Sequence, residues 1–196
     1  MARTLSRPLH GGTGIEITIS DRNDGSLRVT EPDFAQRLAL FWGDPVPLTW
    51  LRQVHGEEIV IVTAPGARSG SEADGAFTEL PNAPLAVTVA DCAPVVIAAA
   101  GSSSQALAVV HAGWRGLMAG IIEKAAVMVV AAAPDGERFT FCGPCIGADD
   151  YQFSATDLVP IAERYGPTVV SRTRHGGPAL DLFAGVSCAL SRSGFP

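Results

Sequence analysis

The sequence predicts a single layered domain of the α/β or α+β class with a mostly buried sheet. Three observations lead to this prediction. The chain has 196 residues, of which 47% are hydrophobic and 17% are charged, a composition typical of a globular protein with a substantial core. Strand-like and helix-like segments alternate unevenly along the chain. No linker or internal repeat divides it, so we expect residues 1–196 to form one domain.

The first half of the chain contains mainly strand-like segments. Alternating or β-branched apolar residues predict strands over 15–20, 58–62, 85–89 and 95–98. We expect the last two to be buried and to be separated by Pro94, because proline cannot donate a hydrogen bond within an interior strand. Residues 21–25 predict a turn, residues 34–41 a short helix, and residues 64–70 a loop.

The second half adds helices. The apolar run 106–110 predicts a further strand, and helical spacing of apolar residues predicts one long helix over 117–132. A strand at 138–141 then leads into a loop at 142–147. Two more helices are expected at 157–165 and 180–191.

Composition excludes several classes of function. The formal net charge is −6 and no basic run exceeds two residues, so we expect no nucleic-acid partner and no anionic membrane surface. No uninterrupted apolar run reaches about 18 residues, which argues against a transmembrane helix. The first residues lack the apolar core of a signal peptide, so we expect a cytoplasmic protein. In that compartment its four cysteines are expected to be thiols or ligands rather than disulfides.

Three residues form a candidate metal site. His55, Cys92 and His111 each lie at the end of an apolar, strand-like segment, where a sheet presents side chains to a cleft. Two imidazoles and a thiolate suit zinc, and three protein ligands leave one coordination position open for catalysis. The separations do not match a zinc finger. The alternative is that Cys92 packs as a small hydrophobe and that both histidines are merely hydrogen-bonded.

Charged residues near these positions have more than one interpretation. Arg115 at the start of the predicted long helix suits an anion such as phosphate, or is simply solvated. Trp114 stacks on a planar ligand or packs in the core. Asp91 and Asp74 orient a ligand histidine, transfer protons, or cap turns.

The segment Cys-Gly-Pro-Cys at 142–145 has the spacing of a thioredoxin dithiol. That function requires an amphipathic helix directly after the second cysteine. Residues 146–150 are a poor helix interior, which argues against a redox role.

Five motifs occur in the order in which one known family carries them: Gln-Val-His-Gly at 53–56, Ala-Asp-Gly-Ala-Phe-Thr at 73–78, Ala-Asp-Cys at 90–92, His-Ala-Gly-Trp-Arg-Gly at 111–116, and Gly-Pro-Cys-Ile-Gly at 143–147 followed by Tyr151. As a set, the motifs resemble those of the laccase-domain proteins, also described as multicopper polyphenol oxidase-like or YfiH-like purine nucleoside phosphorylases. The resemblance implies one αββα layered domain of the YfiH, or cysteine-hydrolase-like, type.

The same resemblance implies a function and a ligand set. It implies zinc held by His55, Cys92 and His111, and phosphorolysis of purine nucleosides such as adenosine, inosine or methylthioadenosine, with adenosine deamination as a companion activity. Arg22 is the counterpart of an arginine that lines the family's pocket. The family's C-terminal strand motif is expected to be missing. Copper is the alternative metal, although four histidines are too few for a laccase copper set.

Purine nucleoside and phosphate are therefore the expected partners of a monomer or small homo-oligomer. Arg22 and Arg115 would hold phosphate, and Asp91 or Asp74 would transfer protons. Three other hypotheses stay open. Cys92 is the nucleophile of a cysteine hydrolase or amidase with a histidine as its base, the protein is a copper polyphenol oxidase, or zinc only stabilises a non-enzymatic interaction module.

Overall fold

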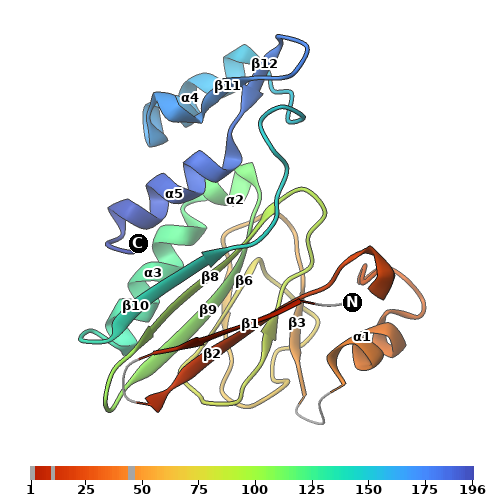
Figure 1. Cartoon of the computed structure of the whole chain (residues 1–196), viewed down its shortest axis with the longest axis vertical. Coiled ribbons are helices and arrows are strands. Elements are labelled where there is room, and N and C mark those ends of the chain that lie inside the picture. Colours follow the sequence, from red (N-terminus) through yellow and green to blue (C-terminus); the bar gives the residue numbers. More distant parts are fainter. Residues whose placement is uncertain (1–2, 10–11, 44–46) are drawn as a thin grey trace.

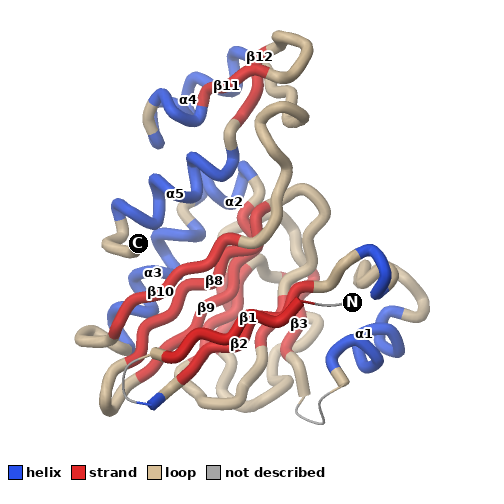
Figure 2. The backbone as a smooth tube through the Cα atoms, in the orientation of Figure 1, coloured by secondary structure: helices blue, strands red, loops and turns tan. Residues whose placement is uncertain are grey.

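A central sheet with strand order β10-β8-β9-β6-β4 organises the fold (Figures 1 and 2). The computed structural model describes residues 3–9, 12–43 and 47–196. Strands β10, β8, β9 and β6 pair antiparallel in succession, whereas the edge strand β4 pairs in parallel with β6. The sheet consists of β4 (Ile59–Ile61), β6 (Gly75–Thr78), β8 (Ala93–Ala100), β9 (Gln105–Ala112) and β10 (Glu137–Cys142).

Helices cover one face of this sheet (Figure 1). They are α2 (Trp114–Ala119), α3 (Ile121–Ala132) and α5 (Leu182–Arg192). Alternation along β8 and β9 puts one set of apolar side chains in the same core as these helices, including Val95, Ile97 and Val110. Beyond α5 lie α4 (Ala155–Tyr165), the short η3 (Pro167–Val169) and the hairpin of β11 (Val170–Arg172) and β12 (Pro178–Leu180).

Smaller sheets cover the opposite face. The hairpin of β1 (Arg3–Pro8) and β2 (Gly14–Ile19) buries Ile15 against Val96 of β8 and Val109 of β9. These two valines lie on the face of the central sheet opposite to the main core, because side chains alternate between the two faces along each strand. Beside it lies a sheet of β5 (Ser71–Glu72), β3 (Thr49–Arg52) and β7 (Leu85–Ala86).

The fourth layer is α1 (Phe34–Trp42), which packs on β3 through an edge-to-face contact of Phe34 with Trp50, with ring centroids 4.8 Å apart. The order of layers is therefore helix, sheet, sheet, helix, and the predicted mixed α+β class is confirmed. Among the described helices, none has the length and apolar character needed to cross a membrane.

The predicted helix over 117–132 is wrong as a single element. Gly120 adopts a φ of 93°, and its N–H bonds to the carbonyls of Gly116 and Leu117, so that α2 ends there and α3 starts again at Ile121. A left-handed residue interrupts the helical ladder at little cost only when it is glycine. The apolar spacing continues across the break, because both helices bury the same face on the sheet.

Other predictions differ in extent. The strand expected over 85–89 is only Leu85–Ala86, it is half-buried, and Val89 is exposed. The last helix begins at Leu182, because the Asp181 side chain accepts the N–H of Ala184 as its cap. Strand β6, which is four residues long and wholly buried, was not predicted. The expected turn at 21–25 contains the short helix η2 (Arg22–Asp24).

Candidate metal centre

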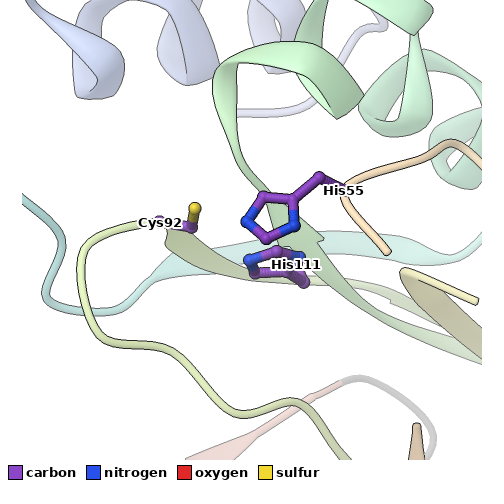
Figure 3. A group of neighbouring side chains, drawn as sticks. All are labelled: His55, Cys92 and His111. Atoms are coloured by element: carbon purple, nitrogen blue, oxygen red, sulfur yellow. The ribbon is translucent and has the colours of Figure 1, made fainter. Parts of the chain in front are cut away.

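His55, Cys92 and His111 meet at one end of the central sheet, where their side chains point toward one another (Figure 3). Their candidate ligand atoms all lie within 4.8 Å of one another. Cys92 directly precedes β8 and His111 is the penultimate residue of β9, and the antiparallel register Ala93–Ala112 explains how residues so far apart in sequence meet. His55 comes from the loop after β3, with its ring 4.8 Å from that of His111, centroid to centroid.

The Asp74 side chain contacts the ring of His111 at Nδ1. Its fully buried carboxylate accepts from Nδ1 of His111 at 2.8 Å, which leaves Nε2 of that histidine free for a metal. A carboxylate on the far nitrogen of a ligand histidine fixes the ring and its tautomer, and is a common companion of zinc ligands. The donor set and this support therefore both fit a zinc ion.

Hydrogen bonds control the charge of this pair. Burial favours the neutral acid of Asp74, but hydrogen bonds from His111 and from three backbone N–H groups outweigh it, so its pKa lies below the ordinary value. Burial alone would lower the pKa of His111. The hydrogen bonds and charges of Asp74 and Cys92 act in the opposite direction and raise its pKa to about 9.

Glycines permit the close approach of the chain to the ligands. A Cβ at Gly113 would lie 3.0 Å from Sγ of Cys92 and 3.2 Å from Cδ2 of His55. A Cβ at Gly116 would lie 2.8 Å from the carbonyl oxygen of Gly56. The motif at 111–116 therefore combines a candidate ligand with a glycine, Gly113, where a Cβ would crowd two candidate ligands, and a second glycine, Gly116, where a Cβ would meet the backbone of the His55 loop.

The loop 142–152 forms the neighbouring wall. Its N–H groups at Ile146 and Gly143 donate to the carbonyls of Asp91 and Pro94 at 2.8 and 2.9 Å. Burial raises the pKa of Tyr151, the charges of Cys92 and Asp91 add to this shift, and Arg115 opposes it. Tyr151 therefore lies among the metal ligand, the acid and the arginine.

Aromatic side chains continue this wall away from the ligands. Phe153 makes edge contacts with Tyr151 and with Trp114, each with ring centroids 5.5 Å apart. The guanidinium of Arg115 lies over Trp114 at 5.1 Å from the ring centroid. Trp114 thus contacts both the core and the arginine. Sequence reasoning missed Phe153, because a single aromatic residue in a loop carries no periodic signal.

The Cys142–Cys145 pair lacks the features of a redox dithiol. Burial raises the pKa of Cys142 to about 12, with Cys145 contributing, and burial also raises the pKa of Cys145. Reactive dithiols depend on a lowered pKa at one sulfur and on a helix directly after the motif. Here the next helix, α4, begins only at Ala155.

The other predicted residues are placed as follows. Asp91 is exposed beside Cys92, and Arg115 is exposed on α2. Because α2 has only six residues, the long helix expected to assist Arg115 is not present. Arg22 is exposed in η2, which Figure 1 shows well apart from α2. Arg115 thus lies in the helix that directly follows His111, whereas Arg22 lies in a separate part of the fold.

The remaining histidines do not enlarge the site. His175 is exposed in the turn between β11 and β12, and His10 lies outside the described residues. Within the described ranges, His55, Cys92 and His111 are the one group of three or more potential metal ligands. A cavity of about 790 Å³ lies elsewhere, between the β1–β2 hairpin and the segment 78–84. None of the three ligands lines that cavity, so the chemistry of the side chains, rather than cavity size, locates the site.

Known proteins resemble this chain in sequence. A purine nucleoside phosphorylase of Streptomyces coelicolor is 35% identical over 153 residues, which cover 77% of this chain and 62% of that protein. One of Xylella fastidiosa is 34% identical over 200 residues, covering 95% of this chain and 75% of that protein. The chain thus spans less than two thirds of the Streptomyces protein.

A solved structure shares the fold. The crystal structure of the Bacillus licheniformis protein YfiH superposes with a TM-score of 0.71 at 22% identity, covering 87% of this chain and 70% of that one. The family model described as "Multi-copper polyphenol oxidoreductase laccase" matches residues 21–196, a range that includes all three ligands. By the extent of this match, the chain belongs to the multi-copper polyphenol oxidoreductase laccase family.

Proposed function

We propose that this protein is a zinc-dependent purine nucleoside phosphorylase that acts on adenosine, inosine or methylthioadenosine. The observation that carries the proposal is the group His55, Cys92 and His111, with Arg115 in the first turn of the helix that follows His111, in a chain whose relatives are named purine nucleoside phosphorylases. A zinc ion bound there would supply a Lewis acid and a water of lowered pKa. Zinc is favoured over copper because a mixed imidazole and thiolate set with one open position suits it.

The chain's own residues would bind and orient the two substrates. In phosphorolysis a phosphate oxygen forms a bond to the anomeric carbon of the ribose. The bond from that carbon to the purine nitrogen breaks, and its electron pair leaves with the purine, which takes up a proton. Arg115 is exposed in the first turn of α2, which follows His111 directly, so its guanidinium can hold the phosphate dianion in place by charge-assisted hydrogen bonds.

The test is direct. Purified protein is incubated with inosine, with and without inorganic phosphate, while its zinc and copper contents are measured. We expect about one zinc per chain, and hypoxanthine with ribose 1-phosphate only when phosphate is present. Release of neither product from any purine nucleoside by zinc-loaded protein would overturn the proposal. Zinc retention without turnover would favour the interaction module, and copper with phenol oxidation would favour the oxidase.

Arg115→Ala is expected to raise the KM for phosphate about tenfold or more, because a hydrogen bond to a charged group contributes roughly 1.5–3 kcal/mol. The KM for the nucleoside should change little. Arg192→Ala is a matched control, since that arginine is also exposed but lies in the last turn of α5 and donates to the carbonyl of Arg164. Steady-state kinetics with phosphate varied at saturating inosine measure the effect. An equal rise in the KM values for phosphate and for the nucleoside would show that Arg115 does not bind phosphate specifically.

Adenosine deamination is proposed as a second activity. In that reaction water adds to the amino-bearing carbon of the purine and ammonia leaves, so a group must move protons. Asp91 is exposed next to Cys92 and meets this need by its position. Ammonia release from adenosine without phosphate tests the activity, and Asp91→Asn should abolish it while zinc stays bound.

One observation favours a second candidate function, a cysteine hydrolase. Asp74, His111 and Cys92 form a series, with Nδ1 of His111 on Asp74 and a ring nitrogen of His111 within 4.8 Å of Sγ of Cys92. This order matches a Cys-His-Asp triad, in which the carboxylate orients the base of a thiol nucleophile. His55→Ala separates the two functions. It removes a zinc ligand and would stop phosphorolysis, whereas a triad hydrolase would continue to act without His55.

A further inference from the structure

Asp74 contacts two of the three ligand residues at once. One carboxylate oxygen, Oδ1, accepts from the backbone N–H of His55 at 2.9 Å and from Nδ1 of His111 at 2.8 Å. The other, Oδ2, accepts from the N–H groups of Val54 and Gly56 at 3.2 and 2.7 Å. A single carboxylate therefore binds three consecutive N–H groups of the His55 loop and the ring of His111.

The His55 loop needs this support. His55 has a φ of 61°, a left-handed conformation that a residue with a Cβ adopts only when its surroundings compensate. Side-chain packing does not supply the compensation, since Val54 is 56% exposed and the His55 side chain is exposed as well. The three hydrogen bonds to Asp74 do, and the resulting turn directs the imidazole of His55 toward His111.

The main chain of Asp74 adds a link to the sheet. Its carbonyl accepts the N–H of His111 at 2.7 Å, and its own N–H donates to Glu58 at 3.0 Å. These bonds fix Asp74 at the start of β6, so the carboxylate is a rigid anchor. The side chain is 0% exposed, and both oxygens are already occupied by two donors each.

We infer that Asp74 is a positioning residue, which fixes both histidine ligands so that their imidazoles converge on one metal ion, and that it does not transfer protons. Its burial and its four donors leave no oxygen that a substrate can reach. This inference rests on the proposed metal site and assigns to Asp74 the role of setting the affinity and geometry of that site. Asp91, whose side chain is exposed, remains the candidate for proton transfer.

The first test compares zinc binding in two variants. Asp74→Asn replaces an acceptor-only group by one that also carries two donors, so it breaks at least one bond to the loop or to His111. We expect zinc affinity, measured by competition with a chelating dye, to fall about 10–100-fold. Asp91→Asn, at an exposed carboxylate, should bind zinc as the wild type does. Wild-type zinc affinity in Asp74→Asn together with lost turnover would overturn the inference.

A second test asks whether Asp74 acts through His55. Cobalt(II) replaces zinc, and its visible spectrum reports ligand number and geometry. Asp74→Asn should keep the thiolate band from Cys92 while its ligand-field bands approach those of His55→Ala. In the double variant the loss of affinity should be clearly smaller than the product of the two single losses, because the residues share one role. Fully multiplicative losses would contradict the inference.

A third measurement needs no variant and keeps the inference testable if Asp74→Asn fails to fold. Amide hydrogen exchange in the wild type should show protection at Val54, His55 and Gly56, although their loop is exposed. Free exchange at these three amides would overturn the inference. The proposed function and the role of Asp74 are contradicted by different results. Wild-type protein that binds zinc but cleaves no nucleoside would contradict only the proposed function. Unchanged zinc binding in Asp74→Asn would contradict only the role of Asp74.

Discussion

Cys92→Ser is expected to release the metal and to reduce phosphorolysis about a thousandfold. A serine hydroxyl is a poor ligand beside two imidazoles, because zinc sites in proteins use the thiolate. Loss of a Lewis acid removes several kcal/mol of transition-state stabilisation, and each 1.36 kcal/mol is a factor of ten in rate. Metal analysis after gel filtration and a phosphorolysis assay measure the two effects together.

Cys188→Ser is the matched control. Cys188 is also a half-buried free thiol, but it lies on α5 and packs against the main core. The Cys188→Ser variant should keep one zinc per chain and wild-type turnover, with at most a modest fall in the midpoint of thermal unfolding. If Cys92→Ser retains zinc, the ligand set is wrong. A different result would favour the hydrolase. If the wild type keeps its activity in the presence of a chelator and Cys92→Ser has no activity, Cys92 acts as a nucleophile.

The sequence was sufficient to predict that His55, Cys92 and His111 lie close together, because their spacing follows from the sheet. Cys92 and His111 lie at the ends of two apolar runs that form an antiparallel pair, so strand ends visible in sequence become neighbours in space. The layered α+β class followed from the same runs. The break at Gly120 was not predictable, since the apolar face continues through it and only the φ of 93° separates the two helices.

The role of Asp74 could not be decided from sequence for a different reason. Asp-Gly at 74–75 is also a common turn sequence, and the four-residue strand that follows Asp74 is too short to show alternation. Only the fold shows that the carboxylate is buried beneath the His55 loop. Arg22 and Arg115 illustrate the opposite case. The resemblance suggested Arg22 and the predicted helix start suggested Arg115 as phosphate ligands, but only Arg115 lies in the helix that directly follows His111.

Gly113→Ala is expected to weaken zinc binding and to lower kcat about tenfold, since the neighbouring side chains must shift by a few tenths of an ångström and a misplacement of about 1 Å costs about a hundredfold. Gly113 has φ −78° and ψ 168°, a conformation that alanine adopts freely, so the backbone need not change. The added methyl group instead meets Sγ of Cys92 at 3.0 Å and Cδ2 of His55 at 3.2 Å. The damage is therefore confined to two ligands of the metal.

Gly147→Ala provides the control, because a Cβ there has no atom within 4 Å. Thermal unfolding of the metal-free proteins should be similar for both variants and the wild type, whereas only Gly113→Ala should lose zinc to a competing dye. This contrast separates folding from ligand placement, which a ligand substitution cannot do. Tight zinc binding in Gly113→Ala would mean that Cys92 and His55 do not bind the metal together, since the methyl group touches both at once.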